Sequence, residues 1–253
     1  MGKYLYGVIA EAADLTLPET GMDGAAVEQV TVGGLTAVFS HTEQEKYEQT
    51  RRHMMSHTRV LEQLLEKQPV LPIRFNTIAQ NETAVCEQLL QARRAELFGL
   101  LDEVRDRIEL GVKAYWYEAT LFEQLLAENP PIKLLRDGLL GKSPEESYYE
   151  RIKLGEMIEL AMNEKRERDK ALILDKLRPL ADKTKTSNIG TERMVINASF
   201  LVEKANEPAF DAAVEALDAQ LGEQMKFKYI GSTPPYNFVT LVVNFVKTAV
   251  EAA

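Results

Sequence analysis

Two apolar runs, 26–32 and 35–40, are separated only by Gly33 and Gly34. A two-residue hairpin turn needs positive φ angles, which glycine adopts without steric cost. The pattern therefore predicts an antiparallel hairpin and limits the fold to classes that contain an antiparallel sheet. Because helical patterns follow this hairpin, we expect an α+β layer in which helices pack on one face of the sheet.

Further patterns in the first half predict a strand over 3–10, a helix over 43–67, a strand over 70–78 and a helix after Asn81. Asn81 is a suitable N-cap for that last helix, which we expect to continue to about residue 108. Apolar residues of the 43–67 helix recur close to one face, at Tyr47, Met54, Leu61 and Leu65. The first half thus has the order β-β-β-α-β-α.

The second half predicts a β-α-β-α-β-β order with one long helix. The elements are a strand over 108–117, a helix over 119–127, a connection over 133–142, a helix over 143–180, a loop over 182–190, a strand over 193–202, a helix over 207–221 and strands over 226–231 and 237–246. The centre of the long helix, 163–170, is almost wholly charged, which predicts exposure there or a helix that bridges subdomains. We expect two α+β domains, 1–107 and 108–253, each a variation on a ferredoxin-like antiparallel sheet with helices packed on it.

Composition excludes several classes of function. The net charge is -9 over 253 residues without a compensating basic stripe, which argues against a nucleic-acid partner. The only cysteine, Cys86, excludes an internal disulfide, fits a reducing cytosol and predicts an inert thiol. We expect no signal peptide and no lipid membrane, because no run reaches the roughly 18 apolar residues of a spanning helix.

The motifs of common active sites are incomplete. His53 and His57 have the i, i+4 spacing of two metal ligands, but Met54 stands where a metalloprotease needs glutamate, so a solvated helix face is the better interpretation. The run 138–143 resembles a phosphate-binding loop, yet Arg136 occupies the position of its first glycine. We therefore predict no catalytic residue, no metal and no cofactor.

Three runs remain as candidates for contact with a partner. The first contains Pro72, Arg74 and Phe75; Pro72 cannot donate a ladder hydrogen bond and so predicts a strand that lies at a sheet edge or begins there. The second is the strand that carries the only tryptophan, and the third is a rigid turn between strands. Together they supply the candidate residues Pro72, Arg74, Phe75, Lys113, Trp116, Pro234, Pro235 and Tyr236.

Six segments extend across residues 4–238: 4–9, 70–75, 109–113, 151–156, 197–202 and 231–238. The second is similar to the motif LP(V/I)RFG, the fifth to NA(A/S)FLV and the sixth to GPWPPY(S/N)F. In this order they resemble the GvpL/GvpF family of gas-vesicle proteins and do not separate GvpL from GvpF. Asn76 departs from the usual glycine, and Ser232-Thr233 departs from Pro-Trp, which puts a shared role of that tryptophan in doubt.

The resemblance implies a minor accessory protein of gas-vesicle assembly that is not an enzyme. Its implied partners are the small hydrophobic shell protein and other accessory proteins, and its implied locations are the cytoplasm during assembly and the gas vesicle, including the gas-facing side of the wall. The physical interpretation adds strand addition or a hydrophobic groove as ways to shield a shell subunit. A small-ligand-binding or enzymatic protein that uses a cleft between the halves is the alternative.

Overall fold

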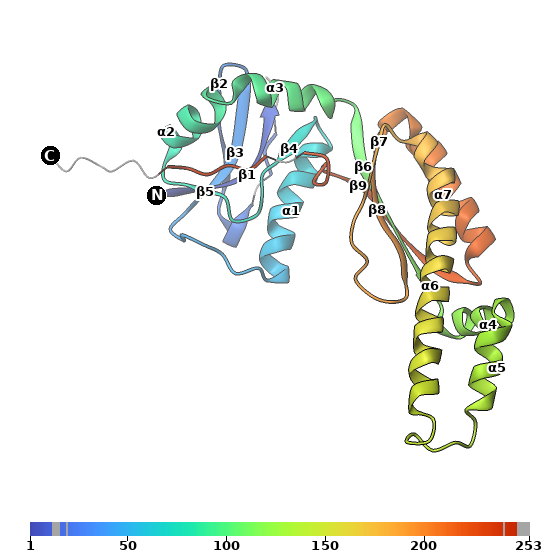
Figure 1. The fold of residues 1–253 in the computed structure, drawn as a ribbon. Coiled ribbons are helices and arrows are strands. Elements are labelled where there is room, and N and C mark those ends of the chain that lie inside the picture. The colour runs from blue at the N-terminus through green and yellow to red at the C-terminus, as the bar shows by residue number, and fades with distance from the viewer. Residues whose placement is uncertain (12–15, 19, 240, 247–253) are drawn as a thin grey trace. The chain divides into compact units, whose positions relative to one another are not determined.

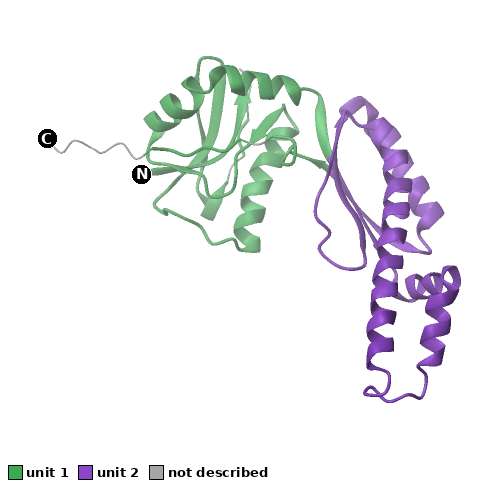
Figure 2. Ribbon diagram, in the orientation of Figure 1, with its two compact units in different colours: residues 1–109, 232–253 green, residues 110–231 purple. Residues whose placement is uncertain are grey.

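In the computed structural model the chain forms two compact units: unit 1, residues 1–109 with 232–253, and unit 2, residues 110–231 (Figure 2). The structure describes residues 1–11, 16–18, 20–239 and 241–246. This grouping differs from the expected division into 1–107 and 108–253, because the chain returns to unit 1 after Gly231. Val239 and Leu241 are the physical reason, since both are buried in the core of unit 1.

Unit 1 is built on an antiparallel sheet whose strands stand in the order β2-β3-β1-β4 (Figure 1). Its strands are β1 (Gly2–Ala10), β2 (Val27–Val32), β3 (Leu35–Thr42), β4 (Val70–Pro72) and β5 (Ile78–Ala79), the last of which also pairs with β1. The predicted hairpin is confirmed, with φ angles of 61° at Gly33 and 86° at Gly34. Pro72 lies in the outer strand of the order, as an edge strand requires.

Helices cover both faces of this sheet, although one covered face was expected. The helices are α1 (Arg51–Leu65), α2 (Glu82–Ala84), the π-helical η2 (Val85–Gln91) and α3 (Arg94–Glu103), with a short 3₁₀ turn η1 (Met22–Gly24). Tyr4 and Tyr6 of β1 share one apolar cluster with α1, whereas Leu5 and Val8 share the other with η2 and α3. The strand β1 is apolar on both sides, so each face needs a covering layer.

Unit 2 contains a sheet in the order β7-β8-β6-β9. Its elements are β6 (Arg107–Trp116), α4 (Glu118–Glu128), α5 (Pro130–Gly138), α6 (Tyr148–Leu177), η3 (Arg178–Leu180), β7 (Lys183–Thr186), β8 (Met194–Glu203), η4 (Lys204–Asn206), α7 (Glu207–Leu221) and β9 (Met225–Thr233). Counted along the chain from β6, the strands of this sheet therefore lie in the order second, third, first and fourth. This arrangement confirms the predicted α+β class, with antiparallel sheets and a long helix.

Several local expectations were wrong. The 133–142 connection is largely the helix α5, which Pro130 and Pro131 begin, and the 182–190 loop contains the strand β7. The helix α1 begins at Arg51, because the Thr50 hydroxyl caps it by accepting a hydrogen bond from the His53 backbone N–H. No strand forms over the described part of 237–246, which makes only a single parallel bridge from Leu241 to Ile73.

The charged centre of α6 is exposed only in part: Glu164, Glu167 and Arg168 are exposed, whereas two of its cations are buried. Lys165 and Arg166 are only 4% and 9% exposed. Lys165 Nζ lies 3.2 Å from Asp169 Oδ2, which also accepts a 2.7 Å hydrogen bond from Trp116 Nε1. Arg166 donates to the carbonyls of Glu192 and Met194 at 2.7 and 3.2 Å. Burial is tolerated because each of these cations has oxygen partners inside unit 2.

Candidate functional site

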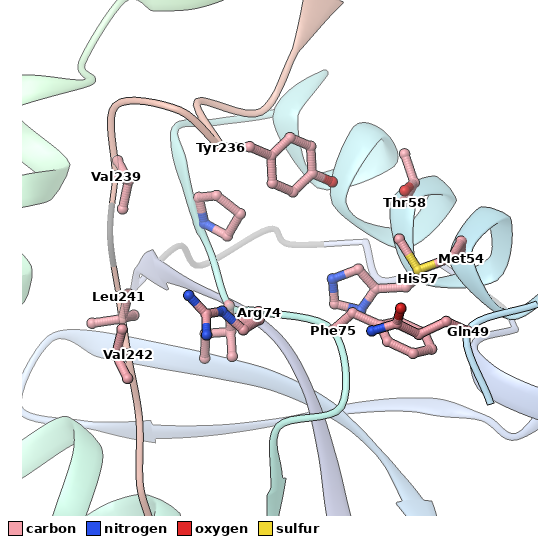
Figure 3. A pocket seen from close by; sticks show the side chains of 12 residues that line it. Gln49, Met54, His57, Thr58, Arg74, Phe75, Tyr236, Val239, Leu241 and Val242 are labelled. Atoms are coloured by element: carbon pink, nitrogen blue, oxygen red, sulfur yellow. The ribbon is translucent and has the colours of Figure 1, made fainter. Parts of the chain in front are cut away.

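A pocket of about 520 Å³ opens on unit 1 between α1, the end of β4 and the segment after β9 (Figure 3). Its walls combine apolar and aromatic side chains with a few polar groups. They are formed by Gln49, Met54, His57, Thr58, Pro72, Ile73, Arg74, Phe75, Tyr236, Val239, Leu241 and Val242. Two of the recognisable sequence segments, 70–75 and 231–238, therefore meet at one site.

A tight turn at the end of β4 positions Arg74 and Phe75. The Thr77 hydroxyl and backbone N–H both donate to the Arg74 carbonyl, at 2.7 and 3.2 Å. Asn76 follows with a φ of 69°, a left-handed conformation that asparagine tolerates better than most residues. Its side-chain amide accepts from the Tyr47 N–H and donates to the Tyr47 carbonyl, both at 2.7 Å, so this departure from the usual glycine adds two hydrogen bonds.

His57 forms an inner wall of the pocket and is not part of a solvated helix face. The side chain is 3% exposed, and burial lowers its pKa to about 4. Its Nδ1 lies 2.9 Å from the Tyr4 hydroxyl, and the ring also makes a hydrogen bond to the Ile73 backbone. The Tyr4 hydroxyl also accepts from the Asn76 backbone, while burial raises the Tyr4 pKa. This chain of neutral hydrogen bonds joins β1 and α1 to the 73–76 turn.

Glu109 anchors the turn that carries Tyr236. Its buried carboxylate accepts hydrogen bonds from the Asn237 backbone N–H at 2.8 Å and from Asn237 Nδ2 at 2.5 Å. The Glu109 carbonyl accepts from the Thr233 hydroxyl at 3.2 Å. Pro234 and Pro235 are buried within this turn. Two motif segments, 109–113 and 231–238, are thereby joined by direct hydrogen bonds.

Tyr236 presents an aromatic ring at the rim while its hydroxyl is engaged. The residue is 39% exposed, and its hydroxyl makes a hydrogen bond to the Thr58 side chain. Burial of the hydroxyl raises the Tyr236 pKa to about 12, so the phenol stays neutral. Arg74 is exposed at the same rim, and its guanidinium has no hydrogen bond or ion pair to any other described residue. The pocket thus offers a partly apolar interior beside the cationic group of Arg74.

Lys113 and Trp116 lie on β6 in unit 2 and take no part in this pocket. Lys113 is partly exposed, whereas Trp116 is 2% exposed and donates to Asp169 inside the unit. Sequence reasoning missed the contributions of α1 and of the segment 239–242. The phase of α1 carries a signal for His57, because Val60, Leu61 and Leu64 lie three, four and seven residues further on and are buried.

The described residues contain no cluster of three or more His, Cys, Asp or Glu that could hold a metal ion. None of their helices combines the length and apolarity needed to cross a membrane. Cys86 is half-buried, and burial, reinforced by Glu82 and Glu87, raises the pKa of its thiol. A thiol with a raised pKa is a poor nucleophile near neutral pH.

Comparison with known proteins places these features in context. The family profile described as "Gas vesicle synthesis protein GvpL/GvpF" matches residues 2–240. Gas vesicle protein F of Nostoc sp. (strain PCC 7120) is 33% identical and covers 95% of this chain and 98% of its own length. Gas vesicle protein F of Microcystis aeruginosa is 30% identical and covers 96% of this chain and 99% of its own length.

A solved structure shows the same fold. The crystal structure of the gas vesicle protein GvpF from Anabaena sp. PCC7120 superimposes with a TM-score of 0.82 at 33% sequence identity. The match covers 96% of this chain and 99% of that one. Both units are therefore part of the shared architecture.

Proposed function

Because the chain belongs to the GvpL/GvpF family of gas vesicle synthesis proteins, which gives it an accessory role in gas vesicles, we propose that it binds the small hydrophobic shell protein through the pocket of unit 1. The observation that carries this proposal is the convergence of segments 70–75 and 231–238 on one partly apolar pocket. A shell subunit before assembly exposes apolar surface and strand edges, and both tend to aggregate. A pocket beside the edge strand β4 is suited to shield them.

The groups around the pocket favour binding over catalysis. His57 is neutral and makes hydrogen bonds to Tyr4 and to the Ile73 backbone, so it is a structural part of the wall. Arg74 and Tyr236 are the exposed anchors, and arginine and tyrosine are enriched among residues that dominate interface energies. We propose that the apolar interior takes a shell side chain while Arg74 binds a carboxylate or carbonyl of the same subunit.

The proposal extends to where the protein acts. It meets shell subunits in the cytoplasm during assembly and stays with the gas vesicle, on the gas-facing side of the wall, together with other accessory proteins. Family membership supports the association with the vesicle. The partly apolar pocket supports a location where apolar shell surface is available.

Pull-down of the shell protein with two rim variants tests the proposal. Arg74→Ala and Tyr236→Ser should each weaken binding about tenfold or more, the loss typical of an interface anchor. Arg105→Ala and Tyr149→Ser are matched controls, because Arg105 and Tyr149 are exposed outside the pocket. Unchanged binding by folded rim variants would remove this pocket from the interface.

A further inference from the structure

The described residues 234–239 and 241–246 cross unit 1 without becoming part of its sheet; we call them the strap (Figure 1). Its side chains alternate along the described residues. Val239 and Leu241 are buried in a core cluster, and Val243 and Phe245 pack against the same cluster. Val242 and Val246 are exposed between and beyond them. The strap therefore has the inside–outside alternation of a half-buried β-strand.

Unit 1 holds the strap backbone mainly through side chains. Arg93 Nη1 donates to the Val242 carbonyl at 2.6 Å. Gln88 accepts from the Val246 N–H at 2.9 Å and donates to the Val246 carbonyl at 3.4 Å, and Gln80 donates to that carbonyl at 3.3 Å. The Leu241–Ile73 bridge is the one contact of strand type in the described strap. These hydrogen bonds involve only backbone atoms of the strap, so they do not depend on which side chains the strap carries.

The groove beneath the strap thus fits an extended segment that carries apolar side chains at alternate positions. It is continuous with the pocket of unit 1, because Tyr236, Val239, Leu241 and Val242 of the strap form one wall of that pocket (Figure 3). Departure of the strap would expose Ile73 and the apolar cluster around it. Such exposure is unfavourable, so an apolar segment that replaces the strap stabilises the open groove.

We propose that the strap is an internal competitor for this groove and that an extended apolar strand of the shell protein displaces it. This inference rests on the proposed function and adds how the shell protein is recognised. The bound shell strand would place apolar side chains at alternate positions and make the same backbone hydrogen bonds as the strap. An occupant held in the same chain acts at a high effective concentration, so binding in trans is restrained until the strap is released. Strap and shell strand are mutually exclusive.

A reversible clamp tests the exchange in the full-length chain. Ile73→Cys and Leu241→Cys, combined with Cys86→Ser, place two thiols at bridged neighbouring positions, where a disulfide is geometrically feasible. The probe is a fluorescent peptide with the sequence of residues 236–246, added in trans. The reduced protein should bind this peptide, and the oxidised protein should bind it at least tenfold more weakly. Equal binding in the two redox states would overturn the exchange.

A second variant covers the case in which the clamp impairs folding. Leu241→Ser loosens the strap, since Leu241 is buried, and should raise peptide affinity about tenfold or more. Leu140→Ser in unit 2 is the control, because Leu140 is 76% exposed and far in sequence from the strap. If Leu241→Ser binds the peptide no better than Leu140→Ser does, the groove is not a site of exchange.

The same redox pair, tested with the shell protein, separates the two proposals. Weaker shell binding by the oxidised form supports displacement of the strap. Equal shell binding by both forms overturns the inference while leaving the proposed function intact. Exchange of the peptide without any shell binding removes the shell strand as the occupant and contradicts the proposed function.

Discussion

Units 1 and 2 each bury polar side chains beneath a helix, but they do so with different chemistry. In unit 1 the buried partners, Tyr4 and His57, are both neutral. In unit 2 the buried Lys165 forms an ion pair with the partly buried Asp169, which also accepts a hydrogen bond from Trp116. Protonation of His57 is therefore expected to destabilise unit 1, whereas loss of the partner of Lys165 is expected to destabilise unit 2.

The largest expected effect comes from breaking the charged cluster of unit 2. Asp169→Ala leaves Lys165 buried without its carboxylate and should lower the free energy of unfolding by about 3–5 kcal/mol. Glu167→Ala on the same helix removes an exposed partner of Lys170 and should cost less than about 1 kcal/mol. Trp116 is the only tryptophan, so its fluorescence in urea follows unit 2. Similar losses in both variants would contradict a special role for the buried pair.

The next largest effect concerns the neutral pair Tyr4 and His57 in unit 1. The folded pKa of His57 is about 4, below an unfolded value of about 6.5, so the unfolded chain binds a proton first as pH falls. Stability contributed by neutral His57 is complete above pH 6.5 and should decline by up to about 3 kcal/mol as pH falls to 4.

Urea unfolding of unit 1, followed by circular dichroism between pH 7 and 4, measures the slope of the free energy of unfolding against pH. His57→Gln should flatten it, whereas His53→Gln, on the same helix but bonded to the Glu48 carbonyl at the surface, should keep it. If the His57→Gln variant retains the full slope, another group is responsible.

The smallest effect tests the turn that carries Arg74 and Phe75. Asn76→Gly relieves any strain at a φ of 69° but removes both hydrogen bonds to Tyr47, at a cost of about 1 kcal/mol. Asn76→Ala removes the same bonds and adds strain, for a total of about 2–3 kcal/mol. Thermal unfolding of the two variants gives the comparison. Equal stability of the glycine and alanine variants would show that the left-handed conformation carries no cost.

The amino-acid sequence by itself determined the features that depend on local chemistry. The Gly33-Gly34 hairpin formed because only positive φ angles close so short a turn. The helix Glu207–Leu221 and the Asn81 cap followed from apolar period and capping geometry. Pro72 lies at the sheet edge because proline has no N–H to donate. The ordered family motifs likewise identified the family without coordinates.

Tertiary structure alone decided which of these parts meet. The strap belongs to unit 1 and not to the second domain, in which it was expected. The reason is that Val239 and Leu241 are buried in an apolar cluster of unit 1. Two cations of the charged stretch of α6, Lys165 and Arg166, are buried because Asp169 and backbone carbonyls partner them. Local pattern carries no information on the partners that lie far away in sequence, namely Trp116 and the carbonyls of Glu192 and Met194. The free energy of burying a polar group depends on them, so the pocket and the strap emerge only when the chain is folded.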